Sequence, residues 1–268
     1  MGAPGDNYQT GATWVFTRTG TTWSQQGPKL VGTGARGPLV QQGQSVALSA
    51  DGNTLAESGP SDADETGATW VFTRTGSTWS EQGPKLVGTG ASGLYGAAQG
   101  TSIALSANGN TLAASGPHDN RFAGATWVFT RTGSTWSEQG PKLVGSGASG
   151  LSDAFQGTSV ALSADGNTLA AGASGENGNV GATWVFTRTG TTWSEQGAKI
   201  VGTGSFLGSV QQGHSVALSA DGSTMATGGW NDNNKLGATW VFLRLAPPCP
   251  ARCGCATSQC QLLSQPRR

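Results

Sequence analysis

Few side chains in this sequence are suited to acid–base or nucleophilic chemistry, and they do not gather into a motif. The two histidines, His118 and His214, occupy different places in the chain, and no G-x-S-x-G, H-E-x-x-H or phosphate-binding glycine loop occurs. The sequence therefore predicts a protein that is not an enzyme, with no catalytic residue and no cofactor.

Charged residues do recur at fixed intervals. Glutamates stand at Glu81, Glu138 and Glu195, and arginines stand at Arg18, Arg74, Arg131 and Arg188. A charge repeated at the same place many times is typical of a structural pairing rather than of a single active site.

One tryptophan, Trp230, lies outside any regular spacing and is followed by Asn231, Asp232 and Asn233. An aromatic ring beside amide groups suits a sugar, which stacks on the ring and accepts or donates hydrogen bonds at its edge. The alternative is a tryptophan that only covers its own loop. Other candidate ligand-binding residues in segments of variable sequence are Tyr95, His118 and Asp119.

Oxygen ligands for a cation are scarce. Asp62, Asp64 and Glu65 form the densest acidic segment and are weak candidates for a metal site, with a solvated acidic loop as the alternative. We therefore expect no metal.

The composition indicates which elements must position these residues. Of 268 residues, 44 are glycine, 10 are tryptophan and only 11% are charged, with a net charge of zero. This composition is typical of a turn-rich all-β protein and excludes a coiled coil or a collagen. Without a basic excess we expect no nucleic acid as partner. No apolar run is long enough for a membrane-spanning helix, and the first residues do not resemble a signal peptide.

Internal repeats set the architecture. The string G-A-T-W-V-F begins at Gly11, Gly67, Gly124, Gly181 and Gly237, at intervals of 56 or 57 residues. The strings S-(V/I)-A-L-S-A and T-W-S-(Q/E)-Q-G recur with the same period. A period of this length indicates a repeat protein.

Each period predicts four strands, here given for one example of each: Ser45–Ser49, Thr54–Ser58, Ala12–Arg18 and Trp23–Val31. Asp-Gly or Asn-Gly joins the first two strands as a hairpin turn. Proline cannot donate to a ladder, so Pro28, Pro84 and Pro141 predict that the fourth strand is the outer edge. Alternating tryptophan and phenylalanine in the third strand predict packing between neighbouring sheets. These features predict a β-propeller of four-stranded blades.

The strands can be assembled in two ways. Four periods and a partial one, hence four or five blades, can close as a four-bladed ring or remain as three complete and two partial blades. We expect a propeller domain over residues 1–245. We expect a disordered tail over 246–268 that carries Cys249, Cys253, Cys255 and Cys260, with a disulfide-linked cap as the alternative.

The stretch Q-G-x-S-V-A-L-S-A-D-G-N-T-L-A, followed by G-A-T-W-V-F, resembles the FG-GAP or integrin-alpha-like propeller repeat. Gly2-Ala3-Pro4 matches its G-A-P element, whereas Gln-Gly replaces its F-G element. The resemblance implies an extracellular or cell-surface propeller that binds proteins or glycans, often with calcium in its hairpins. The hairpins here offer only Asp51, Asn108, Asp165 or Asp221, so calcium is not carried over.

The loops after the second and fourth strands vary in sequence and should share one face. We therefore expect a binding or adhesion module whose protein or carbohydrate ligand contacts that face, without membrane insertion. One alternative is a structural fragment of a longer repeat array that has no ligand of its own. Another is an enzyme that uses the central cleft.

Overall fold

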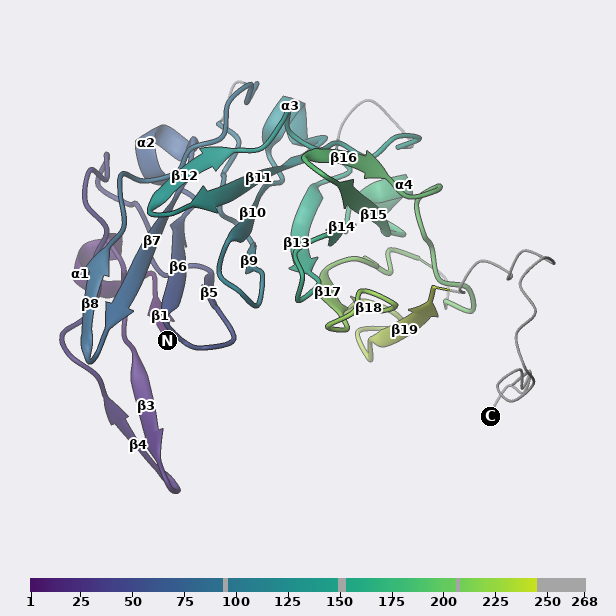
Figure 1. Cartoon of the computed structure of the whole chain (residues 1–268). Coiled ribbons are helices and arrows are strands. Elements are labelled where there is room, and N and C mark those ends of the chain that lie inside the picture. The colour runs from purple at the N-terminus through teal and green to yellow at the C-terminus, as the bar shows by residue number, and fades with distance from the viewer. Residues whose placement is uncertain (94–95, 149–152, 206–207, 245–268) are drawn as a thin grey trace, which may run out of the picture.

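The computed structural model describes residues 1–93, 96–148, 153–205 and 208–244. Its sheets stand side by side in an open arc, with the N-terminal strands at one end and the last strands at the other (Figure 1). The predicted cysteine tail, residues 246–268, lies outside the described residues.

Three successive repeats each form a four-stranded antiparallel sheet whose strands follow chain order from the inside of the arc outward. Blade 2 contains β5 (Val46–Leu48), β6 (Thr54–Gly59), β7 (Ala68–Thr75) and β8 (Thr78–Glu81). Blade 3 contains β9 (Ile103–Leu105), β10 (Thr111–Gly116), β11 (Ala125–Thr132) and β12 (Thr135–Glu138). Blade 4 contains β13 (Gln156–Leu162), β14 (Thr168–Ala173), β15 (Ala182–Thr189) and β16 (Thr192–Glu195). The prediction of an all-β, propeller-like fold is confirmed.

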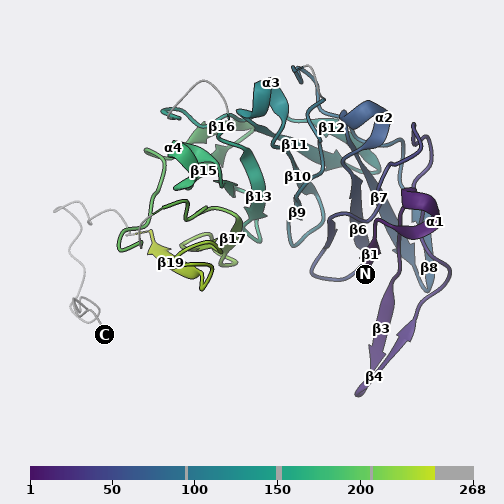
Figure 2. The same ribbon diagram turned by 180° about the vertical axis from the view of Figure 1, so that it is seen from behind.

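The two ends of the arc are partial blades. Blade 1 pairs β1 (Gly2–Ala3) with β2 (Ala12–Thr13), and β3 (Phe16–Thr19) with β4 (Thr22–Gln25). Blade 5 contains β17 (Ser215–Leu218), β18 (Thr224–Gly229) and β19 (Ala238–Leu243). Figures 1 and 2 place these two blades at opposite ends. Of the two predicted assemblies, the structure therefore has three complete and two partial blades, not a closed four-bladed ring.

The outer strands are shorter than predicted. The strand expected over Trp23–Val31 ends at Gln25, bends at Gly27 and Pro28, and resumes only as a bridge between Leu30 and Thr13. Pro84 and Pro141 lie in the same bend of their blades. The fourth strand is the outer edge, as predicted, but its proline lies just beyond the ladder, where no backbone donor is needed.

One-turn helical segments, which were not predicted, connect the second and third strands. They are α1 (Asp6–Gln9), α2 (Asp62–Glu65), α3 (Asp119–Phe122) and α4 (Glu176–Asn179), and they follow one another along the arc (Figure 1). Each contains residues with positive φ, so none is a regular α-helix.

Neighbouring blades are held together by a tryptophan that packs on a glycine. Trp70 is fully buried, and a Cβ added to Gly32 of the preceding blade would lie 2.1 Å from its ring. Its indole Nε1 donates to the Thr33 carbonyl at 2.7 Å. Trp127 and Trp184 make the same contact with Gly88 and Gly145. The predicted packing of the third-strand tryptophans between blades is confirmed.

A buried glutamine fixes the backbone of each of these glycines. The side-chain oxygen Oε1 of Gln42 accepts from the Gly32 N–H at 2.6 Å, and the side-chain nitrogen Nε2 donates to the Gly32 carbonyl at 2.9 Å. Gln99, Gln156 and Gln212 pair in the same way with Gly88, Gly145 and Gly202. Both backbone groups are thereby satisfied without water, as buried polar groups require.

The recurring charges also link blades. Arg131 donates to Asn110 of its own blade and to Gln82 of the preceding one, each at 3.0 Å, and its guanidinium lies 5.4 Å from the ring of Trp136. Glu138 accepts from the backbone N–H of Thr89 in the preceding blade at 2.8 Å. The predicted structural role of these residues is confirmed.

We expect Gln99→Leu to lower the free energy of unfolding by about 2–4 kcal/mol, because it leaves the N–H and carbonyl of Gly88 buried without partners. Urea denaturation followed by tryptophan fluorescence measures this. Gln25→Leu is the control, because the exposed Gln25 donates only to the Gly27 carbonyl. Equal midpoints for the two variants would contradict the role given to Gln99.

Candidate ligand-binding loops

The loops between the second and third strands have an unusual backbone. We call them the crown loops, residues 5–10, 61–66, 118–123, 175–180 and 231–236. Each contains three consecutive residues in the left-handed region, as in Ala63, Asp64 and Glu65 with φ of 50°, 55° and 64°. A left-handed turn costs roughly 1–2 kcal/mol for each residue with a Cβ. Such strain persists only where the surrounding structure enforces it, and it is common at functional sites.

The next blade enforces this turn. The carbonyls of Glu65 and Thr66 accept from the backbone N–H groups of Ala98 and Gln99 at 2.7 and 3.0 Å. Bonds of this type recur at the other complete blades. The backbone of the turn therefore faces the neighbouring blade, and the side chains at its centre, such as Asp64, point to solvent.

A carboxylate paired with a lysine anchors the start of each of the first four crown loops, and it is buried in all of them except the first, where the Asp6 side chain is 25% exposed. Asp62 accepts from the backbone N–H of Arg36 at 2.6 Å and forms an ion pair with Lys85 of its own outer segment. Asp119 accepts from Ser92 N–H at 2.7 Å and pairs with Lys142 at 2.6 Å. Glu176 pairs with Lys199, and Asp6 with Lys29. These contacts place the loops after the second and fourth strands together on one face, as predicted.

The three weak metal candidates do not converge. Asp62 is buried in its ion pair with Lys85, whereas Asp64 and Glu65 are exposed. Over the described ranges, no three His, Cys, Asp or Glu side chains lie close enough together to hold a metal ion.

In the hairpin turn between β5 and β6, hydrogen bonds from Ser49 and from Asn53 lower the pKa of Asp51 to about 2.

Glu57 is the exception among the buried carboxylates. It is fully buried in β6, where only the Thr13 side chain and the Gly32 backbone of blade 1 offer its carboxylate hydrogen bonds, neither of good geometry. Burial raises its pKa from 4.5 to about 7. The β-ladders place Ala114, Ala171 and Thr227 at the equivalent positions, so the contact between blades 1 and 2 differs from the others in carrying this acid.

Polar and aromatic side chains converge around Trp230, which is 46% exposed. Its indole donates to the Gln211 amide oxygen at 2.5 Å, and the rings of His214 and Trp230 are 6.2 Å apart in an edge-to-face arrangement. Lys235 lies 5.9 Å from the centre of the Trp230 ring, and Asn231 donates to the Ser209 carbonyl. An open cavity of about 500 Å³ adjoins Trp230 and His214.

The other predicted ligand-binding residues do not join this group. Asp232 is buried, as are the equivalent Asp62, Asp119 and Glu176, while Asn233 is exposed in the left-handed turn. Asp119 is committed to Lys142, and the His118 ring packs against Phe122 at 5.2 Å and Phe155 at 6.5 Å in blade 3. Tyr95 lies outside the described residues.

Sequence reasoning missed two sets of residues. Gln211 and His214 reach Trp230 because the pairing of β17 with β18 brings together segments 16–19 residues apart, which a linear motif does not reveal, and Lys235 approaches it from the same loop. The structural role of the anchoring acids was also missed, although they recur with the period of the repeat at Asp6, Asp62, Asp119, Glu176 and Asp232. Sequence reasoning makes Asp62 a metal candidate, and Asp119 and Asp232 ligand-binding candidates. When the repeats are aligned on their tryptophans, these five acids fall at one equivalent position.

No protein-family model and no curated protein matches the chain. Among solved structures, a putative 6-phosphogluconolactonase from Bacteroides uniformis is similar with a TM-score of 0.54 and 11% identity over 88% of this chain. Hydrazine synthase from Kuenenia stuttgartiensis gives a TM-score of 0.42 and 16% identity over 74% of this chain. The chain spans 66% and 45% of the lengths of those two chains. The first likeness supports a propeller-like fold alone.

No helix among the described residues has the length and apolar character needed to cross a membrane.

We expect the stability of the protein to fall as the pH rises from about 4.5 to about 7. In this interval the unfolded chain has released the Glu57 proton and the folded chain still holds it. Glu57→Gln should therefore stabilise the protein by about 2–3 kcal/mol at pH 8 and have little effect at pH 4. Denaturation curves of the two proteins at both pH values, with the exposed Glu65→Gln as control, test this. A Glu57→Gln effect that does not change with pH would contradict it.

Removal of divalent cations should leave the protein as stable as before, because the crown-loop acids are paired with lysine or dispersed in solvent. A bound ion would stabilise the folded state by mass action. Melting curves in calcium and in EDTA should agree within ~2 °C, and a larger loss in EDTA would reveal a cation site.

Proposed function

We propose that this chain is a non-enzymatic binding or adhesion module whose crown loops, together with the loops after the outer strands, contact a protein or carbohydrate ligand. The repeat resembles FG-GAP and integrin-alpha-like propellers in the segments quoted above. On that resemblance we propose an extracellular or cell-surface location. The proposal includes no nucleic acid partner and no membrane insertion.

One observation carries this proposal: variable side chains are held out from a strained backbone that, in the first four crown loops, is anchored by a carboxylate–lysine pair and by the next blade. At the centres of the turns stand the sequences N-Y-Q, A-D-E, N-R-F, N-G-N and N-N-K. Tyr8 is 92% exposed in the first of them. The carboxylates, lysines and neighbouring blade that hold the turn are nearly constant, which leaves its outward side chains free to change. A rigid scaffold with variable loops is how many proteins position ligand-contacting residues.

The Trp230 group indicates the chemistry that blade 5 suits. Its ring is held by Gln211, so one aromatic surface is oriented before a ligand arrives. Asn233, Asn234 and Lys235 are exposed beside it and supply hydrogen-bond donors and acceptors. Flat aromatic surface with several amides at its edge matches a carbohydrate better than an apolar peptide. We therefore propose a glycan as the ligand of this loop.

A glycan array probed with the purified chain tests this proposal. For the glycans that the parent chain binds, Trp230→Ala should weaken binding about tenfold or more. Loss of ~1.4 kcal/mol of stacking energy changes affinity by that factor. Trp230→Phe keeps an aromatic face and should retain most of the binding. Val144→Ala, at an exposed site on the outer side of blade 3, is the control.

Two results would overturn the glycan assignment. One is an array on which the chain retains no glycan. The other is a set of retained glycans whose affinity is the same for Trp230→Ala and for the parent chain.

A further inference from the structure

The junction between blades 1 and 2 exposes side chains whose equivalents elsewhere in the complete blades are buried. Phe16 in blade 1 is 39% exposed, whereas Phe72, Phe129 and Phe186 at the same position are each 3% exposed. Val46, at the start of blade 2, is 40% exposed, whereas Ile103 and Val160 are 6% and 7% exposed. These differences mark an interface that is incomplete within the described residues.

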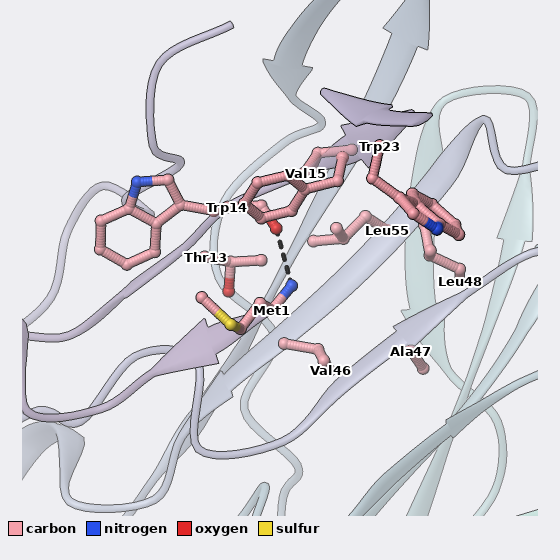
Figure 3. Close-up of a pocket in the computed structure, with 10 residues that line it drawn as sticks. Met1, Thr13, Trp14, Val15, Trp23, Val46, Ala47, Leu48 and Leu55 are labelled. Atoms are coloured by element: carbon pink, nitrogen blue, oxygen red, sulfur yellow. Dashed lines mark hydrogen bonds between the residues drawn. The ribbon is translucent and has the colours of Figure 1, made fainter. Parts of the chain in front are cut away.

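A groove lies at this interface. It has a volume of about 410 Å³ and is lined mainly by Val15, Trp23, Val46, Leu48 and Leu55 (Figure 3). In blade 2, the strand β7 pairs with β6 on one side and with β8 on the other. In blade 1, β3 pairs only with β4 among the described strands. β1 occupies only the end of the second-strand position, where it pairs with Ala12 and Thr13. The groove is therefore the place of an inner strand and of the rest of a second strand.

Blade 5 is incomplete in the opposite sense. It has inner, second and third strands but no outer strand within the part of the chain that the structure describes. In the complete blades the outer strand carries a tryptophan whose indole donates to a glutamine of the preceding blade, as Trp136 does to Gln82. At blade 5 the corresponding glutamine is Gln196, and it borders a cavity of about 130 Å³ with Met225 and Phe242. Blade 1 offers the matching tryptophan, because Trp23 on β4 is 65% exposed.

The sequence makes the two ends interchangeable. Residues 12–16 and 238–242 are both A-T-W-V-F. The second strand β18 pairs with β19 through Met225↔Phe242 and Ala226↔Val241. Residues 12–16 of another copy can form the same pairs in the same register once β1 leaves Ala12 and Thr13, its strand partners within the chain. They would also bring β4, an outer strand that β19 lacks among the described residues.

We propose that this chain forms a dimer by strand exchange, in which residues 12–25 of one copy, carrying β2, β3 and β4, leave β1 and replace β19 on β18 of the other. The exchanged hairpin completes blade 5 of one copy, and β17 and β18 fill the groove at blade 1 of its partner. A second copy is the occupant because β3–β4 and β17–β18 of one chain lie at opposite ends of the arc (Figures 1 and 2). Exchange of identical elements is an accessible route to dimers.

The exchange also closes the arc. Each copy keeps its three complete blades, and each exchange creates one composite blade, so a reciprocal dimer has eight. Propellers typically have 4–8 blades. Trp23, Phe16, Val46 and Leu48 would then acquire the surroundings that their equivalents have in the complete blades.

Sedimentation of the full chain over a range of concentrations gives the first test. We expect a species of about twice the chain mass of 27.0 kDa. Trp23→Ser should raise the concentration needed for dimerisation at least tenfold, because Trp23 would dock in the partner. The control Val144→Ser removes another exposed apolar side chain, away from the exchange site, and should leave the dimer unchanged. A monomer at every concentration would overturn the proposal.

A designed cross-link gives the second test and does not depend on folding of the Trp23 variant. In blade 2, Thr54 is the strand partner of Thr73. The equivalent residues are Thr224 in blade 5 and Thr17 in blade 1. In the double variant Thr17→Cys and Thr224→Cys, the exchange predicts a disulfide between two copies, identified by peptide mass spectrometry. A link within one monomer would instead establish ring closure of a single chain and overturn the dimer, as would a failure to link.

Discussion

The structure depends on one contact between blades, in which a buried glutamine amide holds a glycine against the tryptophan of the next blade. The glycine must lack a side chain because the indole occupies that place, and its backbone groups must find partners because water is excluded. The glutamine supplies both partners at once. The stacking of the blades, and with it the curvature of the arc, follows from repeating this contact at Gly32, Gly88, Gly145 and Gly202.

The crown loops depend on the same contact. The residue that holds the glycine, such as Gln99, also donates its backbone N–H to the carbonyl of Thr66 in the preceding blade. The left-handed turn and the tryptophan contact are therefore parts of one junction. Because the junction is satisfied by backbone and buried groups, the outward side chains of the turn contribute little to it, and their sequences can differ between blades without disturbing the fold.

The periodic features of the fold could be predicted from the sequence, and the features that arise from contact between repeats could not. The strand order, the edge position of the fourth strand and the packing of Trp70 follow from strings that recur. The left-handed turns were not foreseen because A-D-E and N-R-F have no residue that demands positive φ; the next blade imposes it. The loop anchors pair Asp62 with Lys85, 23 residues away, and each partner alone looks like an ordinary surface charge. At the candidate site Trp230 and the polar residues after it were identified, but Gln211 and His214 come from the segment before β17.

The near identity of the junctions has a consequence for the history of such chains. Each blade contacts its neighbours through the same glycine, glutamine and tryptophan, so a duplicated repeat meets partners that already fit it. The number of blades can then change by unequal recombination between repeats without a new interface having to arise. Each added repeat also brings a crown loop whose exposed residues are free to diverge. The same event that lengthens the arc therefore adds a loop that can acquire a different binding surface.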